Sequence, residues 1–248
     1  MRPHTNIVET LKKGVWKPDG HYKKYIPKDQ LVFVGYDGAG LELRMFAHYV
    51  NDPEYTKEIV GGDIHTANQL AAGLPTRDDA KTFIYAFLYG AGDAKLGSII
   101  GGTSKDGAEI RAKFLAAYPN LARLIDDTKE LAAKGYLVGL DGRKLVMRRS
   151  EDGNVAVHKA LNTLLQAAGA VVMKWAMVRL DEQVKAQGLR AWKVLDVHDE
   201  GQWECHPEDV EALRAIMEEC VTWAGIKLGL NCPLASDSQF GASWLDTH

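Results

Sequence analysis

The sequence has only three cysteines, Cys205, Cys220 and Cys232, and no C-x-x-C spacing. An odd number of widely separated cysteines provides no disulfide framework and argues against a zinc cluster. The patterns G-x-S-x-G and H-E-x-x-H are also absent. Their absence argues against a Ser-His-Asp hydrolase and against a histidine-ligated metalloprotease. Because free cysteines suit a reducing compartment, we expect a cytoplasmic location.

Long hydrophobic runs are missing as well. No apolar run approaches the roughly 18 to 20 residues that a membrane span needs, and Met1-Arg2-Pro3-His4 is no signal peptide. We therefore expect no membrane association. The 248 residues suffice for one or two domains with a substantial core. The net charge of -3 hides basic pairs such as Arg143-Lys144, which could meet a polyanion but are more commonly solvated.

Apolar periodicity predicts the elements and their order. In chain order we expect a strand at 31–37, helices at 41–50 and 63–119, a hairpin turning at Asp141-Gly142, a helix at 155–187, two strands meeting at His198-Asp199, and a helix from about Pro207. This order predicts an α+β fold in which a helical subdomain, roughly residues 63–135, interrupts a sheet domain.

Two acidic residues stand where predicted strands end. Asp37 closes the run "LVFVGYD", and Asp199 lies where two later strands meet, within "VLDVHDEGQW". Both carboxylates can thus project from one rim of a sheet. Such a pair is the usual way to hold Mg²⁺, which prefers oxygen ligands and leaves positions open for substrate phosphates. The alternative is that each Asp is a turn residue or a helix cap.

A third pattern lies in "PTRDDAKTFIYAFLYGAG". Thr76 followed by Asp79 makes a box-like N-cap, so a helix should begin at Arg77 and end near Gly90. The helix places Arg77, Lys81, Tyr85 and Tyr89 on one stripe. Cations at a helix N-terminus suit a triphosphate, and the rings beyond suit a base or sugar. The alternative is an amphipathic helix with a wet cationic face and rings in the core.

Polar residues also recur every four positions on the long helix. His158, Asn162 and Gln166 share one face of an otherwise apolar segment. Amide groups can read the minor-groove acceptors that every base pair offers, and so test pair shape without reading sequence. The equally open alternative is that these groups satisfy one another, or the backbone, in a core.

These segments resemble those of a known family. "DGAGLELR", "RDDAKTFIYAFLYG" and "VHDE" resemble motifs A, B and C of family A DNA polymerases, the DNA polymerase I type, and look closest to replicative enzymes of short-tailed bacteriophages. "GDIHT", "LDGRK" and "ALNTLLQAAGA" resemble further family segments. Each segment alone is weak, but together they run in order from about Leu31 to the C-terminus with compatible spacing.

The resemblance implies a fold and a reaction. It implies a palm of antiparallel sheet and helices over residues 1–62 and 136–248, and helical fingers over residues 63–135. The reaction would be template-directed addition of deoxynucleotides to a primer 3'-OH with two Mg²⁺ ions. Asp37 and Asp199 would bind the metals, with the backbone carbonyl of Gly38 as a further ligand, and Glu200 would be a secondary acid.

The resemblance also implies roles around the substrates. Arg77 and Lys81 would hold the triphosphate, assisted by His65, while Glu42 would disfavour a ribose 2'-hydroxyl. Tyr85 would pack on the incoming sugar, and a Tyr there implies tolerance of dideoxynucleotides. The residues expected to contact template or primer are Tyr89, Gln166, Asn162, Arg143 and His198.

Two departures from the family pattern bear on these expectations. Ala39 stands where the family commonly has Ser, and we expect a mild effect because the nearby ligand is a backbone carbonyl. No thumb or 3'-5' exonuclease domain is recognisable in the chain. We therefore expect a split polymerase, with a separate polypeptide supplying thumb and exonuclease, working on primer-template DNA and dNTPs in the host cytoplasm if phage-encoded. The alternatives are a single-subunit RNA polymerase and a non-catalytic nucleic-acid-binding remnant.

Overall fold

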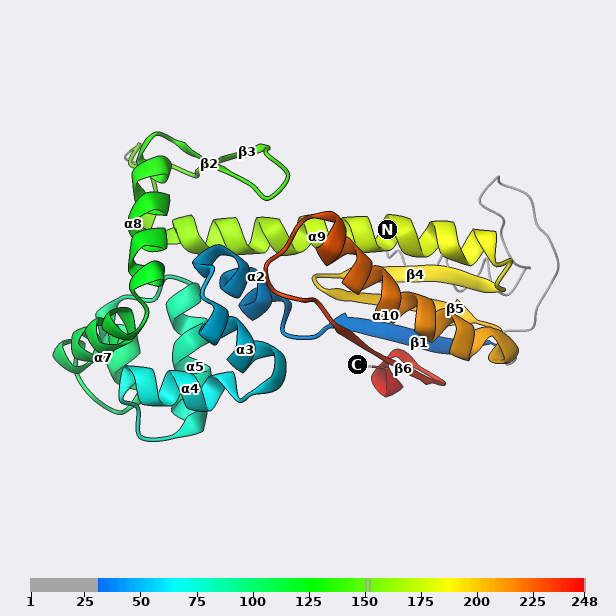
Figure 1. The fold of residues 1–248 in the computed structure, drawn as a ribbon, viewed down its shortest axis with the longest axis horizontal. Helices are drawn as coiled ribbons and strands as arrows, with labels where there is room; N and C mark the ends of the chain where they lie inside the picture. The colour runs from blue at the N-terminus through cyan, green and yellow to red at the C-terminus, as the bar shows by residue number, and fades with distance from the viewer. Residues whose placement is uncertain (1–30, 150, 152, 248) are drawn as a thin grey trace. The chain divides into compact units, whose positions relative to one another are not determined.

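The computed structural model describes residues 31–149, 151 and 153–247. These residues form two compact units (Figure 1). A sheet unit contains residues 31–39, Val172–Lys227 and 234–247, and a helical unit contains residues 40–171 and Leu228–Pro233. Two further basic pairs, Lys12-Lys13 and Lys23-Lys24, and the segment Met1-Arg2-Pro3-His4 lie outside the described residues.

The sheet unit is built on four antiparallel strands in the order β4-β5-β1-β6. The strands are β1 (Val32–Gly38), β4 (Ala191–Val197), β5 (Glu200–Cys205) and β6 (Ser236–Gly241). Two 3-10 turns, η3 (Pro207–Asp209) and η4 (Trp244–Asp246), and helix α10 (Val210–Lys227) complete the unit, together with the later part of α9 (Ala160–Ala186). Figure 1 shows α10 lying along the sheet.

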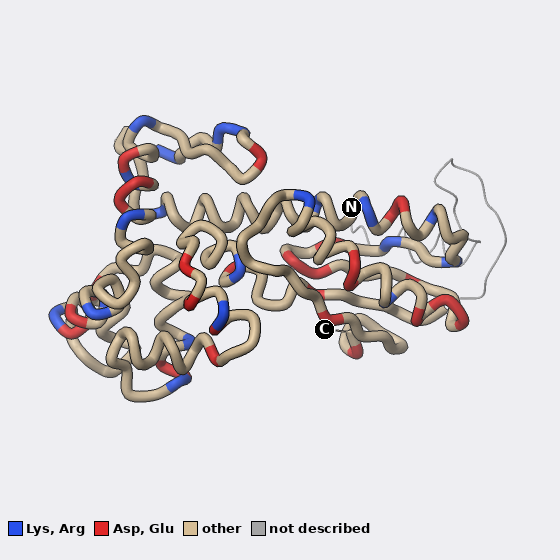
Figure 2. Tube along the Cα trace, viewed as in Figure 1, with Lys and Arg blue, Asp and Glu red and all other residues tan. Residues whose placement is uncertain are grey.

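Alternation along the strands gives the sheet one apolar and one polar face. Val34 and Tyr36 on β1 are buried on the face toward α10, opposite Trp203 and Gly201 of β5. Gly35 and Asp37, which alternate with them along β1, face the other side, because successive side chains of a strand point to opposite sides. Figure 2 shows acidic positions, in red, at the turn between β4 and β5.

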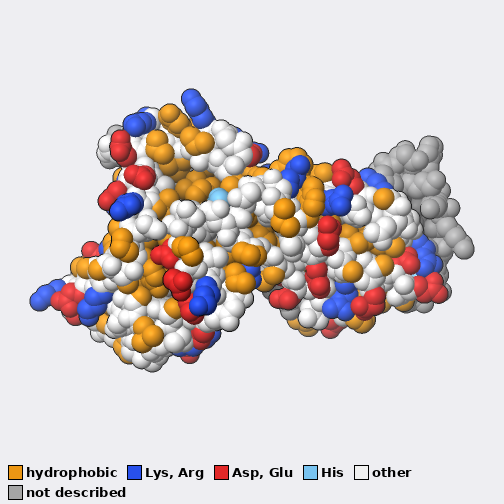
Figure 3. Space-filling view, viewed as in Figure 1, with side chains coloured by type: hydrophobic (Ala, Val, Ile, Leu, Met, Phe, Trp, Pro, Cys, Tyr) orange, Lys and Arg blue, Asp and Glu red, His pale blue; other side chains and the backbone are white. Residues whose placement is uncertain are grey.

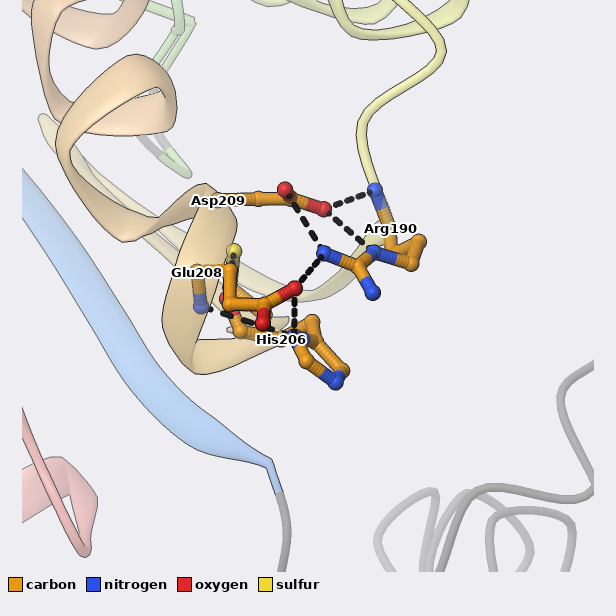
Figure 4. A network of polar contacts seen from close by, with 5 residues as sticks. Arg190, His206, Glu208 and Asp209 are labelled. Carbon is orange, nitrogen blue, oxygen red and sulfur yellow. Dashed lines mark hydrogen bonds and ion pairs between the residues drawn. The ribbon is translucent and has the colours of Figure 1, made fainter.

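An ionic network joins the beginning of β4 to the turn before α10 (Figure 4). Arg190 donates from Nε to Asp209 at 2.8 Å and from its second guanidinium nitrogen to Glu208 at 2.9 Å. Its backbone N-H also donates to Asp209. A carboxylate that receives several charge-assisted bonds holds both segments in register, so the hairpin of β4 and β5 is anchored at the end away from its turn.

The helical unit contains most of the remaining elements. Its helices are α2 (Leu41–Val50), α3 (Pro53–Gly61), α4 (Ile64–Ala72), α5 (Arg77–Leu88), α6 (Asp93–Ile99), α7 (Ser104–Ala117), α8 (Pro119–Ala133) and the first part of α9, which follows the 3-10 turn η2 (Val157–Lys159). A two-stranded hairpin, β2 (Tyr136–Val138) and β3 (Lys144–Val146), connects α8 to this turn.

Aromatic rings fill the core of the helical unit. Phe83 and Phe87 of α5 make edge contacts with Phe114 of α7, at ring-centroid distances of 5.1 and 5.3 Å. Tyr118 links Phe114 to Tyr55 of α3. Edge-to-face contacts of this kind add to the free energy gained from area burial, so they hold α5 firmly on its apolar side.

The predicted α+β architecture is confirmed, with differences at particular elements. Helix α9 begins at Ala160 rather than near Val155, because Val155 pairs with Arg149 in an isolated bridge and η2 intervenes. Strand β6 was not predicted. The three cysteines are buried and free, as expected from their spacing. Trp175 of α9 is partly exposed, and its ring packs edge-on against Trp223.

One apolar segment is longer than we expected. Residues 157–186 are long and apolar enough, by length and composition alone, to cross a membrane, with a mean hydropathy of 1.2. The expectation that no stretch approaches this length was wrong on that measure, because a mean over a window is not interrupted by single polar residues such as Asn162 and Gln166. Half of this window is buried inside the structure, which is typical of a core helix.

Candidate active site

The sheet unit contains an acidic hollow of roughly 470 Å³. It is lined by Asp37, Val197, His198, Asp199, Glu200, Asp237, Gln239 and Thr247. Four of these side chains are carboxylates, and they come from three adjacent strands and the turn between β4 and β5. The two aspartates predicted from the sequence therefore lie in one place.

Strand pairing explains how Asp37 and Asp199 meet. Asp37 on β1 pairs with Glu200 of β5, and the N-H of Gly38 donates to the carbonyl of Asp199 at 3.0 Å. His198 and Asp199 form the two-residue turn of the hairpin, with His198 at a φ of 54° in the left-handed region. The end of β1 thus lies beside the tip of the neighbouring hairpin, as expected from the two apolar runs.

Glu200 differs from the two aspartates in its surroundings. It is buried, and its Oε1 accepts hydrogen bonds from the indole N-H of Trp244 and from the amide of Gln202. Gln202 in turn accepts a hydrogen bond from Thr247 at 2.8 Å. A carboxylate held by one donor on its own strand and one on η4 is suited to fix the floor of the hollow rather than to move with a substrate.

Sequence reasoning missed a fourth acid. Asp237 of β6 pairs with Asp37 on the side of β1 opposite to Glu200, and Gln239 follows two residues later on the same face. The segment "SDSQFG" has no apolar run that would predict a strand. In the structure the first four residues alternate between buried and exposed, as in a strand with one buried face. This alternation cannot be recognised from the sequence unless β1 is known to be the neighbouring strand.

The side chains of the hollow suit a divalent metal ion. Its donors are carboxylate oxygens, with Asp37 exposed and Asp199 half-buried, and this donor set suits Mg²⁺. Within residues 31–149, 151 and 153–247, no group of three or more His, Cys, Asp or Glu side chains is arranged to hold a metal by itself. An Mg²⁺ ion shared with substrate phosphates needs about two carboxylate ligands and must keep its other coordination positions open. The residues of the hollow therefore fit such an ion.

The second group of predicted residues lies on α4 and α5 of the helical unit. Thr76 caps α5 by accepting from the N-H of Asp79 at 3.1 Å, and the helix ends at Leu88, as predicted. Arg77 and Lys81 are exposed, Tyr85 is half-buried and Tyr89 is about half exposed. The opposite side of the helix, with Phe83 and Phe87, is the buried one. The cationic and aromatic stripe is therefore accessible to a ligand.

Arg77 has a partner on the neighbouring helix. Its Nε donates to Asp63 at 2.7 Å, and a second guanidinium nitrogen donates to the same carboxylate at 3.1 Å. The hydrogen bonds from Arg77 hold the pKa of Asp63 well below its usual range, so this carboxylate is charged at neutral pH. Asp63 also caps α4 through the N-H groups of His65 and Thr66.

His65 lies beside this stripe. Its ring centroid is 6.4 Å from that of Tyr85. Burial lowers the pKa of His65, and the positive charges of Arg77 and Lys81 lower it further, against the opposing effect of Asp63. The imidazole is therefore predominantly neutral at pH 7. The structure thus brings His65, Arg77, Lys81 and Tyr85 together on two packed helices.

The remaining predicted residues are on other parts of the helical unit. Glu42 is half-buried in the first turn of α2, immediately after Gly40 at a φ of 57°. Asn162 and Gln166 lie on the first turns of α9, whereas His158 lies in η2. A Cβ on Gly90 would stand 2.6 Å from the carbonyl of His158, so the segment after Tyr89 passes close to this turn.

Arg143 lies in the turn between β2 and β3. It is exposed and paired with Asp141 of the same turn. Figure 3 shows Lys and Arg side chains beside hydrophobic ones on this hairpin, where Val138 and Val146 are exposed. Lys144 stacks on Tyr136 with its Nζ 4.7 Å from the ring centroid. A basic, partly apolar hairpin of this kind can contact a nucleic-acid backbone.

Comparison with known proteins defines the family. A model described as DNA polymerase family A matches residues 21–246. The chain therefore belongs to DNA polymerase family A, which confirms the resemblance stated from its motifs.

Several relatives can be named. The DNA-directed DNA polymerase of Escherichia phage Phieco32 is 51% identical, over all of this chain and 45% of that protein. The corresponding enzyme of Escherichia phage T7 is 37% identical, over 92% of this chain and 35% of that protein. The chain thus spans less than half the length of these relatives.

A solved structure shows the same fold. It is described as the POL domain of Pol1 from M. smegmatis in complex with DNA primer-template and dNTP. It matches with a TM-score of 0.78 and 23% identity, over 87% of this chain and 40% of that one. The mixed helical and antiparallel architecture is therefore that of a polymerase domain.

Proposed function

We propose that this chain carries out template-directed DNA synthesis, adding deoxynucleotides to a primer 3'-OH. The observation that carries the proposal is the meeting of Asp37 and Asp199 in one acidic hollow of a family A chain. The Pol1 structure contains primer-template DNA and dNTP, and such substrates suit the exposed groups of this chain. In this proposal residues 1–62 and 136–248 act as palm, and residues 63–135 as fingers.

Asp37 and Asp199 would hold two Mg²⁺ ions, with the carbonyl of Gly38 as a further ligand. Bound there, the ions would supply charge neutralisation at the reacting phosphate and lower the pKa of the attacking hydroxyl. The chain's own residues would orient the groups around them. His198 at the hairpin tip would contact the primer end, and Glu200, held by Trp244 and Gln202, would keep the floor of the hollow in place.

The α4 and α5 group would bind the incoming nucleotide. Arg77 and Lys81 would bind the triphosphate through charge-assisted hydrogen bonds, with Lys81 also neutralising charge that develops as the pyrophosphate leaves. His65 would donate a further hydrogen bond to the triphosphate. Tyr85 would pack on the sugar, and Glu42 would exclude a ribose 2'-hydroxyl.

The DNA would be contacted by residues that test shape. Tyr89 would lie beside the templating base, and Asn162 and Gln166 would contact minor-groove acceptors of the nascent pair, with Arg143 on the duplex backbone or groove. We also propose that a thumb and exonuclease region acts together with these residues and is supplied by a separate polypeptide, since the relatives extend beyond the matched region. The complex would act in the cytoplasm of the host, with α9 as a core helix and no membrane involved.

Primer extension tests this proposal. The chain, alone and together with the part of its Phieco32 relative that it does not cover, is given a primer-template and either dNTPs or rNTPs. We expect dNTP incorporation, reduced on the order of 10³-fold in Asp37→Asn, since the ions contribute several kcal/mol to the barrier. The matched control is Asp196→Asn, whose carboxylate on β4 pairs with Lys193 instead.

The other outcomes separate the two rival functions. Preferred use of rNTPs would indicate an RNA polymerase. Tight primer-template binding with no incorporation, even with the added region, would indicate a non-catalytic binding protein. Full activity in Asp37→Asn would contradict the metal assignment.

A further inference from the structure

A group of buried polar atoms lies behind the nucleotide-binding stripe of α4 and α5. Within the described part of the chain, four of them have no hydrogen-bond partner: the Tyr55 hydroxyl, His65 Nδ1, and both amide atoms of Asn68. Asn68 is fully buried and Tyr55 is 2% exposed. Leaving such groups unsatisfied typically costs more free energy than a single hydrogen bond returns, so native proteins rarely keep several together without a reason.

These atoms share one part of the helical unit. The Asn68 amide interacts with the Tyr55 hydroxyl, although the two do not meet the geometry of an ordinary hydrogen bond. Asn68 follows His65 by three residues on α4, so their side chains share one face of the helix. Tyr55 is held in place by Phe46 and Tyr118, with ring-centroid distances of 5.4 and 4.9 Å. The hydroxyl and the amide are thus anchored by the core.

His65 belongs both to this group and to the surroundings of the stripe. The residue as a whole is half-buried, whereas its Nδ1 atom is fully buried, so the ring turns its Nδ1 edge toward the interior. The positive charges of Arg77 and Lys81 are near enough to lower the pKa of the imidazole. A neutral imidazole carries one proton, and the partner of one nitrogen decides which nitrogen carries it.

We propose that Asn68 is a positioning residue for His65. Its amide N-H donates to one internal water, which in turn donates to His65 Nδ1 and thereby places the imidazole proton on Nε2. The Tyr55 hydroxyl orients the amide from the other side. A polar site of this kind is where a buried water is retained.

The effect of this proposal on nucleotide binding rests on the proposed function. With the proton on Nε2, His65 donates to an oxygen of the incoming triphosphate, which accepts hydrogen bonds only. With the proton on Nδ1, the ring presents a lone pair to the same oxygen, and nucleotide binding weakens. Asn68 thus acts on nucleotide affinity without touching the nucleotide.

Nitrogen NMR of the chain without nucleotide tests the proposal directly. Labelling the histidines with ¹⁵N, and assigning His65 by its loss in His65→Gln, gives the tautomer from couplings between ring nitrogens and ring protons. We expect the Nε2-H tautomer in the unmodified chain. Asn68→Leu keeps the side-chain volume and removes the donor, so the Nδ1-H population should rise.

Three further variants make the test specific. Gln69→Leu removes a neighbouring amide that donates to the Pro75 carbonyl, and should leave the His65 tautomer unchanged. Asn68→Ser keeps a donor and makes room for a water, so it should restore the Nε2-H form. Tyr55→Phe removes only the hydroxyl and should shift the tautomer partly. If Asn68→Leu does not fold, Asn68→Ser and Tyr55→Phe test the positioning role instead.

Steady-state kinetics supply a second readout. In primer extension, Asn68→Leu should raise KM for dNTP about tenfold with a smaller change in kcat, as expected for one lost hydrogen bond to a charged group. An Nδ1-H tautomer in the unmodified chain, or an unchanged tautomer in Asn68→Leu, would overturn the positioning role. A shifted tautomer with unchanged KM would leave the positioning role standing and remove His65 from the proposed nucleotide site.

Discussion

The acidic hollow depends on residues that are too small to obstruct it. A Cβ on Gly201, the residue after Glu200, would stand 2.3 Å from the ring of Tyr36. A Cβ on Gly35 would stand 2.3 Å from the amide nitrogen of Gln202, which bonds to Glu200. These close approaches let β1 and β5 pair tightly just before Asp37 and after Asp199. The positions of the two aspartates thus depend on Gly35 and Gly201, which have no functional side chain.

Gly201→Ala should therefore destabilise the sheet unit. The rigid Tyr36 ring is buried and cannot move aside cheaply, so we expect a loss of about 1 to 3 kcal/mol in the free energy of unfolding. Urea denaturation followed by tryptophan fluorescence measures it. Gly61→Ala is the matched control, since a Cβ there has open space around it, and its stability should be close to that of the unmodified chain.

Two histidines of the helical unit should make its stability depend on pH. Burial lowers the pKa of His48, whose Nδ1 accepts the N-H of Asn231, and burial together with nearby cations lowers that of His65. Below about pH 6.5 the unfolded chain binds protons that the folded chain resists, so stability falls as pH decreases. Unfolding midpoints measured between pH 7.5 and 5 should decline.

The variant His48→Gln separates this cause from others. Its amide oxygen can accept the Asn231 N-H and does not titrate, so the decline should be smaller than in the unmodified chain. An unchanged pH dependence in this variant would show that His48 does not contribute to it.

At the level of single residues, the sequence predicted the positions of residues that lie at the end of a strand. Asp37 and Asp199 each close an apolar run, and the structure brings them together. Asp237 was missed because its strand is polar and owes its conformation to pairing with β1. Asn68 was missed because nothing in a helix pattern distinguishes a buried amide from an exposed one. Only packing reveals both.

Elements whose ends are set by local chemistry were predicted best. Helix α5 begins after the Thr76 cap and ends at Leu88, and the hairpin turns at Gly142 with a φ of 80°. The beginning of α9 was misplaced because the bridge between Arg149 and Val155 competes with the helix. Caps and turns depend on hydrogen bonds between a few adjacent residues, so the local sequence predicts them. Pairing between segments that are far apart in the chain cannot be predicted in this way.

The cap of α5 gives a prediction at this scale. Thr76→Ala removes the acceptor for the Asp79 N-H, and should lower the free energy of unfolding by about 1 kcal/mol. It should also fray the turn that carries Arg77 and raise KM for dNTP. Thr82→Ala, at an exposed position in the middle of the same helix, should leave both quantities nearly unchanged. Equal effects of the two variants would contradict the capping role.

At the scale of the whole molecule, the chain combines two units whose chemistry differs. The sheet unit contains the carboxylates of the hollow, and the helical unit contains the cations and rings proposed for the nucleotide. The sequence predicted both groups but assigned their boundary to residues 62–63, whereas compact packing divides the chain after Ala39. Which residues act as palm and which as fingers stays a prediction. Contacts between distant segments decide such a boundary, and a pattern read along the chain does not show them.

The share of the relatives that this chain covers leads to a prediction about these 248 residues tested by themselves. Their net charge of -3 gives no general attraction for DNA, and they span only 45% of the Phieco32 relative. By themselves they should therefore bind primer-template weakly and add few nucleotides per encounter. Adding the part of the Phieco32 relative that they do not cover should increase product length and affinity. Processive synthesis by these residues by themselves would contradict the proposed partner.

The central claim is that Asp37 and Asp199 together form the centre for nucleotide addition. Its most direct test is the single-turnover rate of one dNTP addition in the unmodified chain, Asp199→Asn and Asp196→Asn, with Mg²⁺ and the part of the Phieco32 relative that this chain does not cover. We predict a rate lower by about 10³-fold in Asp199→Asn, with primer-template affinity within a few-fold and Asp196→Asn nearly normal. Addition at the normal rate by Asp199→Asn would contradict it.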